Sequence, residues 1–170
     1  MNTKINTKKL TIAGVLIAIG VILSTFHIQI GIAKCFPIQH LINVICAVLL
    51  GPVYAVMCAF STSLIRNLIG TGTPLAFFGS MIGALFAGIV YHKTKRIYAA
   101  ALGEMIGTGI LGSLISYPIA KLFLANNNAV WYTFVLPFSA STVLGSILAF
   151  ILLTALLKIR AFDVKGLLEK

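Results

Sequence analysis

Apolar residues occur in long segments along this chain, and polar residues gather in short stretches between them. A helix needs about 20 mostly apolar residues to cross the hydrocarbon core of a bilayer. One long apolar segment, residues 36–69, is interrupted by Gly51 and Pro52, which predicts two shorter helices that meet at a turn. The whole pattern predicts six membrane-spanning helices, at about residues 10–33, 37–50, 53–69, 75–92, 97–124 and 133–157.

The composition agrees with this pattern. Hydrophobic residues make up 59% of the 170 residues and charged residues only 9%, with a mean hydropathy of +1.06. Soluble domains contain roughly 45–50% apolar residues. We therefore expect an all-α membrane protein, a six-helix transmembrane bundle that forms a single integral membrane domain over residues 1–170.

The net charge of +10 is informative about topology. Basic residues lie between the apolar segments and not on one face, so we expect no nucleic-acid partner. Lys34, Arg66 and Lys121 fall on one side of the predicted membrane. The other ten fall on the opposite side: Lys4, Lys8, Lys9, Lys93, Lys95, Arg96, Lys158, Arg160, Lys165 and Lys170. The positive-inside rule then places both the N and C termini in the cytoplasm.

Two ionisable residues, Arg66 and Glu104, lie within predicted helices. A charged side chain at the centre of a membrane helix costs about 2.5–3.5 kcal/mol on insertion scales, so both should face the protein interior. Arg66 is near the outer end of its helix and either contacts a ligand or extends to the lipid headgroups. Glu104 lies nearer the cytoplasmic side and either contacts substrate or hydrogen-bonds hydroxyl groups of other helices. Their different depths argue against a direct ion pair.

Polar residues also gather at the predicted outer end of the bundle. His40 and Asn43 are three residues apart, on one face of a helix, as a small polar pocket requires. The alternatives are that His40 caps a helix or meets headgroups, and that Asn43 bonds another helix. The other candidates for substrate binding are Arg66, Asn67, Thr71, Thr73, Glu104, Tyr117, Trp131 and Tyr132. An aromatic belt at the membrane surface would also explain Trp131 and Tyr132.

Small residues recur at four-residue spacing in several segments, which allows helix backbones to approach closely. We expect most of them to serve internal packing, including residues 107–112, which match a dinucleotide-binding Gly pattern but lie within an apolar segment. Gly14 and Ala18 in the first predicted helix are the exception, because they could present a smooth face to a partner membrane subunit.

The sequence offers little for catalysis. His27, His40 and His92 lack metal-ligand spacing with any carboxylate, and no nucleotide-binding lysine motif occurs. The three cysteines, Cys35, Cys46 and Cys58, lack the short paired spacing of a metal or redox site and are expected to be free thiols. We therefore expect no metal, no cofactor and no enzymatic activity.

Five strings together resemble a known family: residues 36–43, 50–54, 66–73, 76–81 and 103–109. They are similar to the S components of energy-coupling factor (ECF) vitamin transporters, and most closely to the ThiW-type proteins associated with hydroxyethylthiazole, a thiamine precursor. Phe78 departs from the family pattern, in which proline is usual at this position.

The resemblance implies a substrate-binding membrane subunit that captures its substrate near the outer surface. It also implies partners: a transmembrane coupling subunit, which the small residues Gly14 and Ala18 would face, and two ATPase subunits. A thiazole ring could stack on Trp131 or Tyr117 and hydrogen-bond His40, Asn43 or Asn67. Thiamine or another vitamin is the alternative substrate, and a membrane-embedded enzyme or a helical scaffold is the alternative class.

Overall fold

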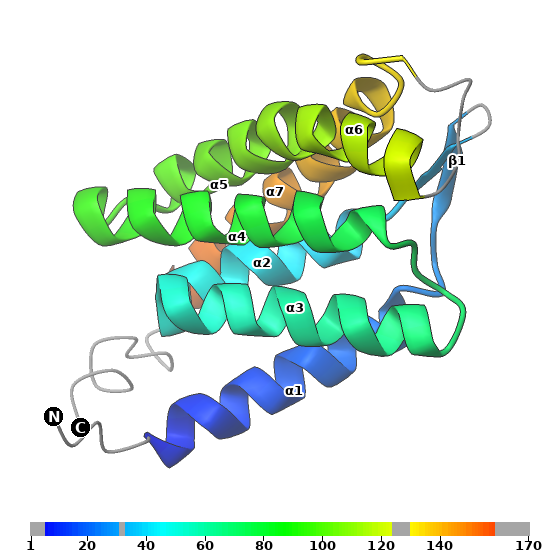
Figure 1. Cartoon of the computed structure of the whole chain (residues 1–170). Coiled ribbons are helices and arrows are strands. Elements are labelled where there is room, and N and C mark those ends of the chain that lie inside the picture. The colour runs from blue at the N-terminus through cyan, green and yellow to red at the C-terminus, as the bar shows by residue number, and fades with distance from the viewer. Residues whose placement is uncertain (1–5, 31–32, 124–129, 159–170) are drawn as a thin grey trace, which may run out of the picture.

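The computed structural model describes residues 6–30, 33–123 and 130–158, and this part of the chain is almost entirely helical (Figure 1). One short antiparallel hairpin joins the first two helices, with Ile28 opposite Cys35 and Ile30 opposite Ala33. The elements in order are α1 (Thr7–Leu23), β1 (Ile28–Ile30), β2 (Ala33–Cys35), α2 (Pro37–Leu50), α3 (Pro52–Leu68), α4 (Leu75–Thr94), α5 (Ile97–Ile106), the π-helix η1 (Gly107–Gly112), α6 (Ser113–Phe123) and α7 (Val135–Lys158).

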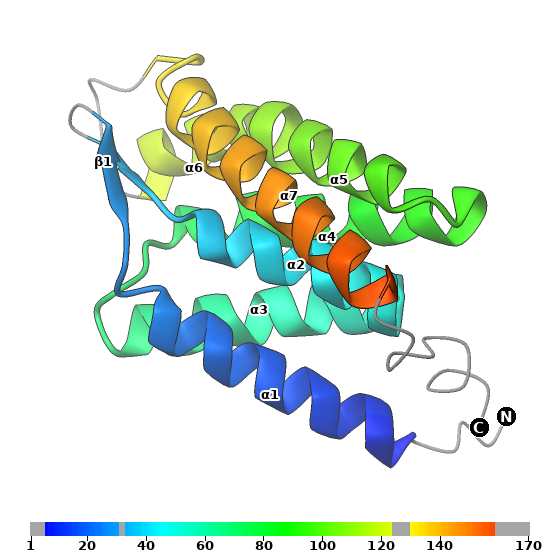
Figure 2. The same cartoon turned by 180° about the vertical axis from the view of Figure 1, so that it is seen from behind.

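Helix α2 is the centre of the molecule. It contacts α1, α3, α4, α5 and α7, and Figures 1 and 2 show it enclosed between α3 and α7. Eleven of its 14 residues are buried. At about 1.5 Å per residue it is about 21 Å long, less than the roughly 30 Å of a hydrocarbon core. Because other helices cover it, its length need not match the bilayer.

Within the described residues, three helices are long and apolar enough to cross a membrane: Leu75–Thr94, Ile97–Phe123, which comprises α5, η1 and α6, and Val135–Lys158. This confirms the prediction of an all-α membrane protein. The turn predicted at Gly51 is also present: Gly51 has a φ of 90°, which suits glycine, and Pro52 begins α3. The prediction of six spans stays a prediction.

The first predicted span, residues 10–33, differs from the structure. Helix α1 ends at Leu23. The hydroxyls of Ser24 and Thr25 bond back to the carbonyls of Val21 and Ile22, so they terminate the helix. The apolar residues beyond them alternate with polar ones and include β-branched isoleucines, a pattern that favours strands. Counting apolar residues alone could not separate the helix from the hairpin.

The small-residue pattern serves internal packing, as predicted. A Cβ added to Gly107 would lie 2.8 Å from Cα of Gly83, and one added to Gly112 would lie 2.7 Å from Cα of Gly79. Helix α4 therefore approaches η1 with backbone against backbone. The six residues that resemble a dinucleotide-binding motif form this π-helix inside the long α5–α6 helix, so they are a packing element.

The two ends of the molecule differ in their chain segments. The start of α1, the α4–α5 connection and the end of α7 lie at one end, and the hairpin and the α3–α4 loop lie at the other (Figure 1). The first end carries the described basic residues Lys8, Lys9, Lys93, Lys95, Arg96 and Lys158.

Candidate functional site

A cavity of about 510 Å³ lies at the hairpin end. It is enclosed by the start of α2, the end of α3, the first turns of α4 and α7, and η1. Its lining is Phe36, Gln39, His40, Arg66, Thr73, Leu75, Ala76, Gly79, Ser80, Thr108, Thr133, Phe134, Pro137, Phe138 and Ser141. Aromatic rings and polar side chains meet there, as in sites for small organic ligands.

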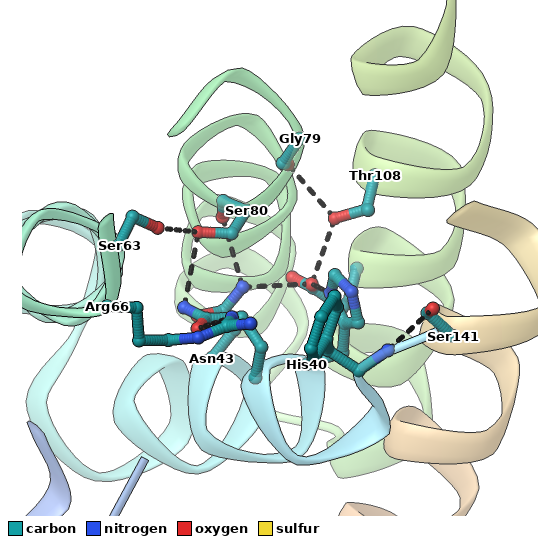
Figure 3. Close-up of polar contacts among 11 residues, drawn as sticks. His40, Asn43, Ser63, Arg66, Gly79, Ser80, Thr108 and Ser141 are labelled. Atoms are coloured by element: carbon teal, nitrogen blue, oxygen red, sulfur yellow. Dashed lines mark hydrogen bonds and ion pairs between the residues drawn. The ribbon is translucent and has the colours of Figure 1, made fainter. Parts of the chain in front are cut away.

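Glu104 accepts hydrogen bonds from a cluster of polar side chains next to this cavity, and Figure 3 shows three of them, His40, Asn43 and Thr108. Its side chain is completely buried. Oε1 lies 2.8 Å from Nδ1 of His40, and it accepts hydrogen bonds from Asn43 Nδ2 at 3.0 Å and from the hydroxyl of Thr108 at 2.9 Å. One oxygen of Glu104 thus joins side chains of α2 and η1.

The bond to Glu104 also orients His40. A carboxylate only accepts, so the proton of the imidazole lies on Nδ1, an assignment that follows from the hydrogen-bond network. His40 lines the cavity. The second ring nitrogen, Nε2, makes no hydrogen bond to the described residues, and it is an acceptor when the ring is neutral.

Arg66 also lines the cavity, and it is only 1% exposed. Its Nη1 donates to Oε1 of Gln39 at 2.9 Å, and its Nη2 donates to the carbonyl of Thr71 at 3.3 Å. The guanidinium lies over the ring of Phe36, 4.2 Å from the centroid, a favourable cation–π contact. Extension to lipid headgroups, one of the two roles considered for Arg66, is therefore wrong.

Two amides link the two buried charges. Gln39 accepts from Arg66 and donates to the hydroxyl of Ser80 at 3.3 Å. Asn43 donates to the backbone carbonyl of Ser80 and to Glu104. Arg66 and Glu104 thus do not pair directly, as their depths predicted. The two amides give each charged group one hydrogen-bond partner without placing the two charges in contact.

Glycines make room for this network. A Cβ on Gly83 would overlap the Thr108 hydroxyl and lie 2.6 Å from Oε2 of Glu104. A Cβ on Gly145 of α7 would overlap the carbonyl of Pro37 and lie 2.8 Å from Cβ of His40. Close packing on both sides fixes the positions of the carboxylate and the imidazole.

Asn67 and Thr71 hold the α3–α4 loop. Asn67 Nδ2 donates to the carbonyls of Ser63 and Thr73, and Thr71 offers its own carbonyl to Arg66. Gly70 turns the chain with a φ of 76°, where a glycine is preferred. Of this loop, Thr73 lines the cavity. The loop thus positions Arg66 and closes one side of the site.

The aromatic candidates lie elsewhere. Trp131 and Tyr132 are 61% and 58% exposed, and neither they nor Tyr117 lines the cavity. Tyr117 instead lies beneath Lys121, whose Nζ is 6.0 Å from its ring centroid. The rings that do line the cavity are Phe36, Phe134 and Phe138, which sequence reasoning did not select.

Gln39, Ser80 and Thr108 were also missed. Gln39 precedes Asn43 by four residues and so shares its helix face, a spacing that could have identified it. Thr108 follows Glu104 by four residues in the same way. Ser80 offered no such signal, because its role depends on the packing of α4 against α2.

A second hollow, a groove of about 670 Å³, runs between α1, α2 and α7. Its wall is made almost entirely of Leu, Ile and Val side chains, such as Val15, Leu16 and Leu153, with Lys9 at one end. Gly14 and Ala18 are exposed on α1, and a Cβ on Gly14 would meet nothing within 4 Å.

The three cysteines are free, as predicted, and the structure shows that all three are buried. Among the described residues no three His, Cys, Asp or Glu side chains come together as a metal site would require. The cavity at the hairpin end thus combines aromatic rings with a few polar side chains.

One comparison identifies a family. A family model described as thiamine-precursor transporter protein (ThiW) matches residues 10–159, which is 150 of the 170 residues. No curated protein matches the chain.

Proposed function

The chain belongs to the ThiW family of thiamine-precursor transporter proteins, and from this premise we propose that it is the substrate-binding S component of an ECF-type importer for hydroxyethylthiazole. Family membership and the apolar helices make it a multi-pass membrane protein. The single observation that supports the proposed substrate best is the cavity at the hairpin end, with phenylalanine rings beside a fixed imidazole and a buried guanidinium.

The cavity suits a small aromatic alcohol. A thiazole ring packs against the Phe134–Phe138 pair, whose rings contact each other with centroids 6.2 Å apart, and aromatic contacts contribute about 0.5–1.5 kcal/mol each beyond burial. The hydroxyl of the ethyl arm donates to Nε2 of His40. Asn43 and Glu104 act through His40, while Asn67 and Thr71 act by holding the α3–α4 loop. Trp131, Tyr117 and Tyr132 take no direct part in binding.

The hairpin end is proposed to face the outside of the cell. The described basic residues at the opposite end, including Lys8, Lys93 and Lys158, support a cytoplasmic location for that end by the positive-inside rule. Both chain termini then lie in the cytoplasm, the six helical segments form a six-helix transmembrane bundle, and the chain is a single membrane domain. Substrate would enter from outside beside the hairpin.

Import needs partners in this proposal: a transmembrane coupling subunit and two ATPase subunits that supply the energy. The exposed, small-residue face of α1 at Gly14 and Ala18 is the proposed contact with the coupling subunit, since small residues permit close helix approach. Replacement of Gly14 by leucine should abolish co-purification with that complex and leave substrate binding intact. Retained co-purification would place the contact elsewhere.

The binding proposal is tested with the full-length protein in detergent. Trp131 is the only tryptophan and lies two residues before the cavity-lining Thr133, so its fluorescence can report binding, with calorimetry as an independent measurement. We expect saturable binding of hydroxyethylthiazole and much weaker binding of thiamine. Preferential binding of thiamine would assign the vitamin itself as substrate, and no binding of either compound would contradict the proposal.

His40 provides the matched variants. His40→Leu removes the acceptor and should weaken binding of hydroxyethylthiazole tenfold or more, whereas it should weaken binding of the methylthiazole without the hydroxyethyl arm far less. An equal loss for both compounds would show that His40 does not hold the hydroxyl. Asn6→Ala, at the opposite end of the molecule, serves as a control and should not change either affinity.

A further inference from the structure

Arg66 is a buried cation in the wall of the cavity. Among the described residues no carboxylate lies within ion-pair distance of it, since the ion pair there is His40 with Glu104. Two hydrogen bonds, to Gln39 and Thr71, occupy two of the five N–H groups of its guanidinium. The Nε atom is buried and has no partner in the protein. Arg66 therefore has N–H groups without a partner in the protein, and it places a positive charge at the cavity.

Glu104 offsets this charge for a ligand only in part, because it makes no direct contact with the cavity. It does not line the cavity, its Oε1 is engaged by three donors, and its Oε2 is buried next to the space that Gly83 leaves. His40 and Thr108 stand between it and the cavity. The remaining acidic residues, Asp163 and Glu169, lie outside the described residues. A ligand thus meets a guanidinium directly and the carboxylate only through other groups.

We propose that Arg66 makes the cavity selective for charge, so that it accepts an uncharged thiazole with a free ring-nitrogen lone pair and rejects the thiazolium cation. This inference rests on the proposed function and assigns the specificity to one residue. A neutral ring offers an acceptor to the unused N–H groups of Arg66. A thiazolium offers no lone pair at nitrogen and adds a positive charge beside a cation.

The expected discrimination follows from Coulomb's law. Two like charges about 6 Å apart at an effective dielectric constant of about 20 weaken binding by about a hundredfold. Thiamine contains a thiazolium, and so does the product of N-methylation of hydroxyethylthiazole. The N-methyl thiazolium salt is the better probe, because it keeps the ring and the hydroxyethyl arm and changes little more than the charge.

The experiment measures the dissociation constants of hydroxyethylthiazole and its N-methyl thiazolium salt by calorimetry, for the wild-type protein and for Arg66→Gln. We expect the wild type to prefer the neutral compound about a hundredfold, and the preference to fall to tenfold or less in Arg66→Gln. The same two ligands are compared on both proteins, so the steric effect of the ligand's added methyl group cancels. The change in preference therefore isolates the effect of the ligand's charge. Lys121→Gln removes an exposed charge at the same end and should keep the wild-type preference.

Arg66→Lys extends the test, because it retains the charge and loses the planar donor geometry. It should bind the neutral compound more weakly and still reject the thiazolium. Equal binding of both compounds by the wild type, or an unchanged preference in folded Arg66→Gln, would overturn the inference. If Arg66→Gln does not fold, the wild-type and Arg66→Lys ratios decide the matter. Failure of the wild type to bind either compound would instead contradict the proposed function, and this inference with it.

Discussion

Two hollows in the described part of the chain differ in chemistry more than in size. The cavity at the hairpin end, about 510 Å³, is lined by polar and aromatic side chains above a buried hydrogen-bond network. The groove between α1, α2 and α7 is larger, about 670 Å³, but its wall is almost entirely aliphatic. Judged by volume alone, the groove would be the better candidate for the ligand site. The buried polar groups select the cavity.

The difference has an energetic basis. An aliphatic groove on a membrane protein can be covered by lipid chains or by another helix at little cost, because both are as apolar as leucine. A buried arginine and a buried glutamate are costly anywhere in a membrane protein and persist where their hydrogen bonds and a function require them. The position of Arg66 and Glu104 is therefore better evidence for a ligand site than the size of the groove.

The largest expected effect comes from removal of the carboxylate. Glu104→Ala leaves Nδ1 of His40 without its acceptor, whereas Asn43 and Thr108 keep their bonds to the carbonyls of Ser80 and Gly79. Loss of one member of a buried charged cluster costs about 3–5 kcal/mol. We expect a lower unfolding temperature in detergent and no measurable ligand binding by calorimetry. Glu104→Gln retains one acceptor oxygen, so its unfolding temperature and its ligand affinity should both fall less. If Glu104→Ala bound the ligand as tightly as the wild type, the proposal that the ligand binds in the cavity and not in the groove would be contradicted.

The next effect tests close packing beside the network. Gly83→Ala places a Cβ on the Thr108 hydroxyl and against Glu104, and overpacking of this kind costs about 1–3 kcal/mol. Gly14→Ala is the matched control, because open space surrounds Gly14 and alanine stabilises a helix by about 0.5–1 kcal/mol relative to glycine. Thermal unfolding should move in opposite directions for the two variants. A shift in the same direction would contradict this account.

A smaller effect is expected from the aromatic wall. Phe134→Leu removes one ring from the cavity and should weaken hydroxyethylthiazole binding by about 0.5–1.5 kcal/mol, or roughly twofold to tenfold. Phe150→Leu, on an exposed part of α7, should leave the dissociation constant unchanged. If calorimetry gives both variants the same affinity, the ring does not stack on the phenylalanines.

The smallest effect is expected in the groove itself. Val15 lines the groove and is 53% exposed, so Val15→Ser should change the unfolding free energy by no more than about 0.5 kcal/mol and the ligand affinity by less than twofold. The tryptophan fluorescence titration used for the wild type measures the affinity. A tenfold loss would mean that the groove, and not the cavity, takes the ligand.

Much of the fold could be predicted from hydropathy and from the residues that interrupt it. Gly51 and Pro52 gave the α2–α3 turn, and the small residues of α4 and of residues 107–112 gave the close helix packing. The prediction for residues 10–33 was wrong beyond Leu23. It rested on apolar composition, which does not separate a helix from a strand. The periodicity of the apolar residues and the hydroxyl group that ends α1 do separate them. Local sequence does contain that information, in Ser24 and Thr25.

For the site, the sequence could nominate polar residues but not their partners. It singled out His40, Asn43, Arg66 and Glu104 because ionisable and amide groups in apolar segments need an explanation. It placed Glu104 at a different depth from His40 and did not foresee the bond between them, which joins residues 64 positions apart. Depth estimated by counting residues assumes straight helices of equal length, whereas α2 is short and central and the α5–α6 helix contains a π-segment.

The sequence by itself determined that this chain is a helical membrane protein with a few polar residues that must be enclosed. The reason is that the free energy of transferring a side chain to an apolar environment depends mainly on the side chain itself. Tertiary structure alone decided which of these residues meet, that Glu104 lies behind His40, and that Arg66 faces the cavity. Hydrogen bonds extend only about 3 Å, so they are set by the packing of α2 against α3, α4 and α5, which no single segment specifies.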